Sequence, residues 1–363
     1  MQTLFPARLR RLRACIRRAG GSAMLVSHLP NVFYLTGFTG DAAMLLVGSG
    51  RPVLLTDPRF TSQAATECRA SGAHIVITRK PLSQEAGEHL AELPRTATAL
   101  FEEDWLSVAQ LRVARSQDRC GCNWKPVQGL VEALREVKDA EEILRMRAAA
   151  RAVSRVVEYA IRVARAGVAE LDIAAEIEYR MKKLGAEGPS FETIVASGAR
   201  AALPHGRASS KRLKEKDLVV LDLGVILRGY CSDLTRTIHV GRASREVRAW
   251  YQAVLEAQTA ARAAVRDGVE AAQVDEAARS VLRGRALERY FVHSTGHGLG
   301  IEVHERPSLR KDQKVALKAG SVVTIEPGIY LPGRGGIRIE DDVLVLDGGS
   351  ETLTTASREL IEV

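Results

Sequence analysis

Short apolar runs alternate with amphipathic segments through the first 130 residues. Aliphatic and β-branched residues predominate in these runs of three to six positions, which is typical of buried strands. The intervening segments have apolar residues at helical spacing. This alternation predicts an α/β domain. The expected strands are residues 23–26, 42–47, 53–55, 74–78 and 99–101.

The start of the chain is rich in arginine and has no acidic residue before Asp41. Such a composition is shared by organelle transit peptides. Leu9, Leu12 and Ile16 nevertheless recur at helical spacing, and Gly20-Gly21 provides a stop. We therefore expect a structural helix here that leads into the first strand.

A long helical pattern at 131–165 follows, and Asp139 is the expected N-cap of its main part. We place a domain boundary here, giving domains 1–130 and 131–363. Helical patterns at 170–184, 244–267 and 271–287 then mix with strand-like runs, which predicts an α+β second domain. The expected strands are 191–196, 218–223, 235–239, 322–326 and 336–346.

The net charge of +8 and the pI near 9.4 raise the question of nucleic-acid binding. Beyond the start, basic residues are scattered among acidic ones, and no nucleic-acid motif with interleaved aromatic residues is present. No apolar run approaches the roughly 20 residues of a membrane span. We expect neither a nucleic-acid nor a membrane partner.

The chain has five cysteines, an odd number without the regular spacing of a disulfide framework. That pattern favours a reducing cytoplasm. Cys120-Gly121-Cys122 is compatible with a metal or redox pair, but a second pair is lacking and the spacing differs from that of redox motifs. Two incidental cysteines near a loop are the simpler interpretation.

Carboxylates interrupt several apolar strands of the second domain. Asp222 lies within the run 218–223, and Asp233 follows eleven positions later, after a turn at 228–230 that would fold the chain back. Glu326 and Glu340 end two further apolar runs. One such acid alone more often caps a turn or pairs with arginine. Four together would repel one another unless a metal neutralised them.

Histidines in a glycine-rich segment complete this pattern. His293 and His297 lie in His-Ser-Thr-Gly-His-Gly-Leu-Gly, and His304 follows. Glycines allow the backbone and the imidazoles to approach one centre. Oxygen-rich ligation with one imidazole suits Mn²⁺ or Co²⁺, and paired metals can activate a water. The residues therefore predict metal-assisted hydrolysis.

These motifs resemble those of the pita-bread metallopeptidases, including Thr-Ile-Glu-Pro-Gly-Ile-Tyr at 324–330 and Gly-Ile-Arg-Ile-Glu-Asp at 336–341. Segments 31–38 and 55–60 resemble the creatinase-like domain of Xaa-Pro aminopeptidases and prolidases. Methionine aminopeptidases generally lack that domain. The resemblance implies an α+β pita-bread catalytic domain preceded by a smaller α/β, RNase H-like domain.

The resemblance also implies a ligand set for two divalent metal ions, most simply Mn²⁺, with Co²⁺ or Zn²⁺ as alternatives. Asp222 and Asp233 would hold one ion, and Asp233 would reach the second. His297 and Glu326 would complete the second site, and Glu340 would bridge both. Glu326 would also act as general base.

Further roles follow from the same resemblance. His205 matches a substrate-side histidine, whereas His293 and His304 would contact the substrate and stabilise the tetrahedral intermediate. Arg338 would pair with a carboxylate, which its place two residues from Glu340 on one strand also favours. Tyr230 and Tyr330 are interpreted as packing or supporting residues.

Two positions depart from the family pattern. Arg200 replaces a common asparagine, and Ser308 stands where prolidases often have an arginine that grips a dipeptide carboxylate. The second departure favours an Xaa-Pro aminopeptidase over an Xaa-Pro dipeptidase. The resemblance also implies a homodimer, because relatives are commonly dimers. Arg306 or Arg310 would keep the dipeptidase alternative open, and a metal-free binding protein is a more remote one.

Overall fold

The computed structural model describes residues 4–91 and 93–363. The chain divides into two compact units, the first ending at Arg135 and the second spanning Glu136–Val363. None of the described helices combines the length and the apolar character that a membrane span needs.

The first unit contains a mixed sheet, as expected for an α/β domain. Its strands are β1 (Ala23–Val26), β2 (Ala43–Val47), β3 (Val53–Thr56), β4 (His74–Ile77), β5 (Thr98–Glu102) and β6 (Asn123–Val127). Within the described residues they form one sheet in the order β4-β3-β2-β1-β5-β6. β1 pairs antiparallel with β2 and parallel with β5. The strand pattern missed β6, an edge strand whose Lys125 and Pro126 break the apolar run.

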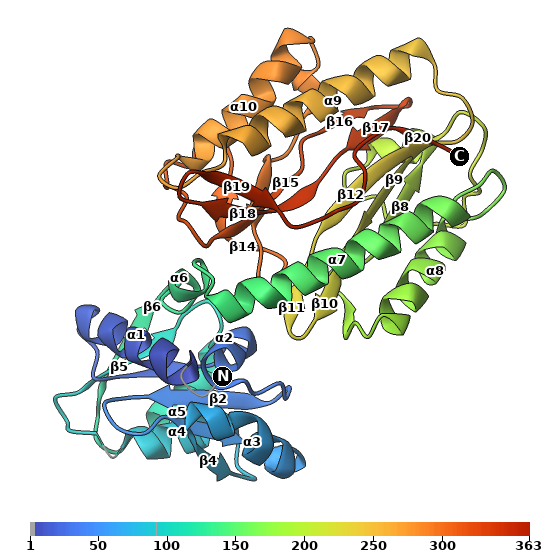
Figure 1. Ribbon diagram of the computed structural model, residues 1–363. Coiled ribbons are helices and arrows are strands. Elements are labelled where there is room, and N and C mark those ends of the chain that lie inside the picture. The colour runs from blue at the N-terminus through green and yellow to red at the C-terminus, as the bar shows by residue number, and fades with distance from the viewer. Residues whose placement is uncertain (1–3, 92) are drawn as a thin grey trace. The chain divides into compact units, whose positions relative to one another are not determined.

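Helices accompany this sheet (Figure 1). The expected first helix is confirmed, and it buries Leu9, Leu12 and Ile16. The helices are α1 (Leu4–Arg18), α2 (Leu29–Thr36), α3 (Thr61–Glu67), α4 (Leu82–Leu90), α5 (Val108–Gln117) and α6 (Glu132–Arg135), with short 3₁₀ turns η1 (Pro58–Phe60) and η2 (Cys68–Ser71).

The second unit carries several small sheets. Its strands are β7 (Gly188–Pro189), β8 (Ile194–Ser197), β9 (Leu218–Leu223), β10 (Val225–Leu227), β11 (Tyr230–Cys231), β12 (Leu234–His239), β13 (Gly296–Gly298), β14 (Glu305–Leu309), β15 (Val322–Ile325), β16 (Gly328–Leu331), β17 (Gly335–Arg338), β18 (Asp341–Leu346), β19 (Gly349–Thr352) and β20 (Ile361–Glu362). Two sheets matter for the site, with strand orders β20-β12-β9-β8 and β14-β13-β15-β18-β19.

Two helix pairs flank these sheets in the second unit (Figure 1). They are α7 (Ala140–Val163) with α8 (Glu170–Lys183), and α9 (Arg245–Ala264) with α10 (Ala271–Gly284); the 3₁₀ turns are η3 (Gly198–Ala202) and η4 (Glu288–Tyr290). Apolar residues of α7 and α8 share a core with β8, β9 and β12. Those of α9 and α10 share another core with β15, β16, β17 and β18. Strands enclosed between helix pairs constitute the expected α+β pita-bread arrangement.

Two expected elements are interrupted. The helical pattern 131–165 breaks between α6 and α7, where Asp139 caps α7 by accepting from the amides of Glu141 and Glu142. The run 336–346 was predicted as one strand, which is wrong. It divides into β17, which pairs with β16, and β18, which pairs with β15 and β19. The break places Glu340 between two strands. Its side chain therefore need not follow the rule that successive side chains of a strand point to opposite faces of the sheet.

Candidate metal centre

Antiparallel pairing brings the two aspartates to one region. β9 and β12 pair with Asp222 opposite Thr235, and Asp233 comes directly before β12. The chain returns through Arg228 and Gly229, which have φ values of 54° and 76° between β10 and β11. The turn expected from the sequence is therefore confirmed. Both aspartates are buried, with 7% and 5% of their surfaces exposed.

His297 reaches the same region from β13, which pairs with β15 at Gly298 and Val323. The flanking glycines are required by this close packing. A Cβ atom at Gly296 would lie 1.9 Å from the Thr324 carbonyl oxygen, and one at Gly298 would lie 2.0 Å from that of Arg306. Any larger residue would push the strands apart and displace the imidazole.

The hydrogen bonds of His297 fix how its ring faces the cluster. Its Nδ1 lies 3.0 Å from the Gly298 carbonyl oxygen, which can only accept a hydrogen bond. Nδ1 of the neutral ring therefore carries the proton, and Nε2 keeps its lone pair. Nε2 lies 3.4 Å from Oε1 of Glu326 and 3.8 Å from Oδ2 of Asp233. This is the tautomer and direction of a metal-ligating imidazole.

Glu340 is held at the cluster by Thr235. Thr235 donates its hydroxyl to Oε2 of Glu340 at 2.6 Å, and the Glu340 amide donates to the Thr235 carbonyl at 3.2 Å. Asp233, His297 and Glu340 each offer a ligand atom, and these three atoms lie within 4.8 Å of one another. Residues distant in the sequence thus meet at one point.

The electrostatics of this cluster call for a cation. Burial, followed by repulsion from neighbouring carboxylates, raises the pKa of Asp233 and of Glu340 well above their usual ranges. Burial also raises the pKa of Glu326 and lowers that of His297. Several buried anions facing one point are stable only if a positive charge compensates them.

Asp222 supplies a direct test of whether the residues fit a metal. Its Oδ2 accepts from Arg338. Within residues 4–91 and 93–363, its Oδ1 is among the buried oxygens without a hydrogen-bond partner. Such an oxygen costs free energy unless a ligand satisfies it. Carboxylate oxygens with one imidazole are a donor set that fits divalent cations.

Arg338 organises one wall of the cluster. It is buried and forms an ion pair with Asp222, while its Nε donates to the Thr235 hydroxyl at 3.0 Å. It also donates to the Tyr330 hydroxyl at 2.6 Å, and Tyr330 lies 2.8 Å from Nε2 of His293. Tyr330 was interpreted from the sequence as a supporting residue, but no pattern revealed that it joins Arg338 to His293.

The remaining histidines lie at the rim. His304 is exposed, and its ring centroid lies 4.4 Å from that of His297. His205 is also exposed, and the carbonyl of the preceding Pro204 accepts from Arg338 at 3.2 Å. Both are thus close to the cluster while remaining open to solvent.

Arg200 has a structural partner. Its Nε donates at 3.1 Å to Glu170, a fully buried carboxylate that also accepts from the Ser197 and Ser209 hydroxyls. Arg200 therefore braces η3 against Glu170, the first residue of α8.

A cavity of about 510 Å³ adjoins the cluster at His293 and Ser308. Its other lining residues include Arg279, Arg310 and Lys311. Arg279 forms an ion pair with Asp275 at 2.6 Å and donates a hydrogen bond to the His293 carbonyl at 2.6 Å. Arg310, Lys311 and Asp312 are exposed, so the rim has two basic residues and one acidic residue and is basic on balance.

The sequence profile of the metallopeptidase family M24 matches residues 144–347, and that of the creatinase/prolidase N-terminal domain matches residues 8–137. An Xaa-Pro dipeptidase of Pyrococcus furiosus is 38% identical over 331 residues, covering 91% of this chain and 92% of that protein.

Two solved structures show the same similarity. An Xaa-Pro dipeptidase from Bacillus anthracis is 36% identical with a TM-score of 0.94, covering 99% of this chain and 100% of that one. An X-Pro aminopeptidase from Thermotoga maritima is 36% identical with a TM-score of 0.89, covering 96% and 100%.

Proposed function

The chain belongs to the metallopeptidase family M24, and we propose that it removes the N-terminal residue from peptides with proline in the second position. Relatives named Xaa-Pro dipeptidase and X-Pro aminopeptidase support this substrate class. The observation that carries the proposal is that ligand atoms of Asp233, His297 and Glu340 lie within 4.8 Å of one another. Beside them, Oδ1 of Asp222 is among the buried oxygens of the described residues that have no hydrogen-bond partner.

These five residues would hold two divalent cations, for which we propose Mn²⁺, with Co²⁺ and Zn²⁺ as alternatives. Oxygen ligands with a single imidazole favour this choice. Such ions polarise a scissile carbonyl and lower the pKa of a water. Asp222 and Asp233 would serve one ion, Asp233, His297 and Glu326 the second, and Glu340 both.

Glu326 would act as general base. Its burial raises the pKa of its carboxyl, which makes it a stronger proton acceptor than an exposed glutamate. Thr324 donates to its Oε1 at 3.3 Å and thereby orients the carboxylate. The proton taken up in the attack step is then available for the leaving amine.

His293, His304 and His205 would bind the substrate at the rim. Burial lowers the pKa of His293, so its ring is neutral. Its Nδ1 donates to the Ser294 carbonyl at 2.8 Å, which leaves Nε2 to accept from Tyr330. His293 can therefore contact a substrate only if it gives up its hydrogen bond to Ser294 or to Tyr330. His205 and His304 are exposed and can contact a substrate directly.

Ser308 and the basic-rimmed cavity bear on substrate length. Ser308 cannot form the bidentate ion pair that an arginine makes with the carboxylate of a dipeptide. We therefore propose an aminopeptidase that accepts longer peptides. The alternative, an Xaa-Pro dipeptidase, would rely on Arg306 or Arg310, and Arg310 lines the cavity together with Lys311.

Steady-state kinetics on matched Xaa-Pro and Xaa-Pro-Xaa peptides with Mn²⁺ would test this choice. We expect kcat/KM of the tripeptide to equal or exceed that of the dipeptide. Ser308→Arg should raise dipeptide kcat/KM about 10-fold, because a charged hydrogen bond contributes about 1.5 kcal/mol or more. Arg310→Ser is the matched control, and under this proposal it should leave the ratio of tripeptide to dipeptide kcat/KM unchanged. If the wild type instead prefers the dipeptide and Arg310→Ser abolishes that preference, the chain is a dipeptidase.

A cytoplasmic location is also part of the proposal, because the five cysteines form no disulfide framework. We also propose a homodimer, the state that the family resemblance implies.

A further inference from the structure

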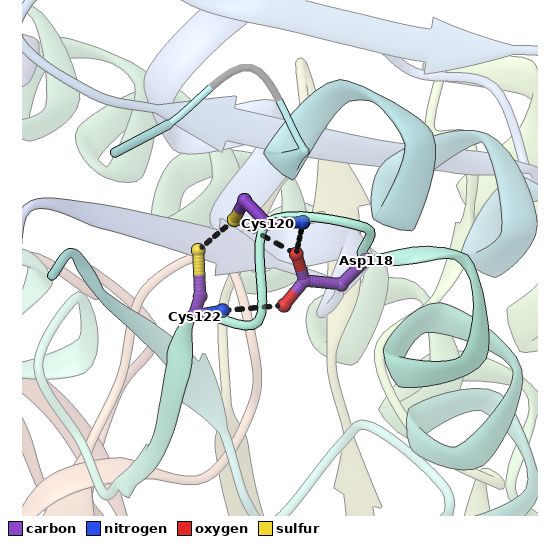
Figure 2. Close-up of side chains that lie close together, drawn as sticks. All are labelled: Asp118, Cys120 and Cys122. Atoms are coloured by element: carbon purple, nitrogen blue, oxygen red, sulfur yellow. Dashed lines mark hydrogen bonds between the residues drawn. The ribbon is translucent and has the colours of Figure 1, made fainter. Parts of the chain in front are cut away.

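A pair of thiols lies in the first unit, away from any residue assigned above. Cys120 and Cys122 belong to the loop between α5 and β6, and their Sγ atoms are 2.8 Å apart (Figure 2). Each residue is 8% exposed and packs into the apolar cluster that contains Ala86, Leu90 and Ala97. The exposed Gly121 between them faces open space.

Asp118 holds this loop in its tight form. Its Oδ1 accepts from the amides of Cys120 and Gly121, each at 3.1 Å, and from the Cys120 thiol at 2.9 Å. Its Oδ2 accepts from the Cys122 amide and from the Trp124 indole, each at 2.9 Å. Figure 2 shows the carboxylate directed at the backbone of both cysteines.

Gly121 permits the turn that brings the two thiols together. Its φ of 71° lies in the left-handed region, which a glycine adopts at little cost. The two cysteines therefore meet because the loop is shaped by Asp118 and Gly121, and their contact is part of its resting conformation.

Asp118, Cys120 and Cys122 have ligand atoms close enough to hold a metal ion. Two observations disfavour that use. Both Asp118 oxygens are already occupied by N–H and S–H donors. A metal would also require two buried thiolates. Burial, the hydrogen bond that Cys122 donates to Cys120 and the charge of Asp118 raise the pKa of Cys122 to about 12.

We propose that Cys120 and Cys122 are a reversible thiol–disulfide site that is oxidised by low-molecular-weight disulfides. A disulfide is neutral, as two thiols are, so its formation adds no charge to the apolar cluster. The proposal is independent of the peptidase activity, because it concerns a loop that carries no candidate catalytic residue.

The exchange proceeds in two steps. One cysteine thiolate attacks a sulfur of the small disulfide, forming a mixed disulfide and releasing one small thiolate. The second cysteine thiolate attacks the protein sulfur of that mixed disulfide and releases the other small thiolate. The two protein sulfurs lose two electrons, the small disulfide gains them, and the cysteine protons pass to the released thiolates. Because the thiolate is the nucleophile, the raised pKa makes oxidation faster at alkaline pH.

The test incubates the full chain in glutathione redox buffers at several pH values. Acid quenching, alkylation and mass spectrometry of the tryptic peptide that begins at Cys120 then follow. We expect this peptide to lose two hydrogens without bound glutathione, and to take up two alkyl groups after reduction. Cys68 is the matched control, because burial raises its pKa to about 11. It should remain a single thiol or form only a mixed disulfide.

Asp118→Ala tests the organisation of the loop. It should slow the second, intramolecular step about 10-fold or more, so that the mixed disulfide accumulates, because the two sulfurs are then less well positioned for reaction. Full alkylation of both cysteines in every buffer, or separate glutathione adducts on each, would overturn the proposal. Protection of the pair from alkylation by added Zn²⁺, without loss of hydrogens, would instead establish a metal site.

Discussion

Glu326→Gln is expected to lower kcat on an Xaa-Pro-Xaa peptide by about 10³-fold, since removal of a general base typically costs 10²–10⁴-fold. The glutamine has the same shape, and the Glu326 amide still donates to the Thr295 carbonyl at 2.8 Å. The variant should therefore fold. Steady-state kinetics with saturating Mn²⁺, together with circular dichroism, measures both properties.

The control for this variant is Glu246→Gln, which removes an exposed carboxylate paired with Arg334 in the same unit. Its kcat should match that of the wild type. Undiminished turnover by Glu326→Gln would remove Glu326 from the role of base and leave it, at most, as a ligand.

Asp341→Ala is expected to destabilise the second unit by about 3–5 kcal/mol, the usual effect of breaking a buried ion pair. Asp341 is fully buried and accepts from Arg236 at 2.8 Å, from Gln258 at 2.7 Å and from Thr354 at 2.7 Å. In the variant, the buried Arg236 guanidinium lacks the carboxylate that neutralises its charge. The urea concentration at the midpoint of denaturation should therefore be lower than for the wild type.

The Glu246→Gln variant is also the control for the destabilisation expected of Asp341→Ala. Its ion pair with Arg334 is exposed on both sides, so its loss should cost at most about 1 kcal/mol. Equal midpoints for Asp341→Ala and Glu246→Gln would show that the Asp341 network does not stabilise the fold.

Much of the site could be predicted from the sequence, because its charged residues lie within or at the ends of apolar strands. Asp222 stands out as a charge within an apolar strand, and burial of an isolated carboxylate is unfavourable. The glycines around His297 were equally informative, and a Cβ at either of its neighbours would strike the backbone. The strand pairing of β9 with β12 followed from the turn between them.

The rest depended on contacts that sequence spacing does not encode. Arg338 pairs with Asp222 across strands, and Tyr330 joins it to His293. The break at Glu340 was not visible from the sequence, because Ile337 and Ile339 before it and Val343 after it continue a strand-like pattern. Cys120 and Cys122 had no second pair to mark them, and only the hydrogen bonds of Asp118 reveal their contact.

The central claim is that five residues of the second unit hold two divalent cations. Metal content tests it most directly: the full chain is stripped with a chelator, reconstituted with Mn²⁺, freed of excess ion and analysed by mass spectrometry. We predict about two ions per chain for the wild type, fewer for Asp233→Asn, and the wild-type number for Glu246→Gln. A wild-type chain that retains no metal and hydrolyses no Xaa-Pro peptide would contradict the claim and favour a metal-free binding protein.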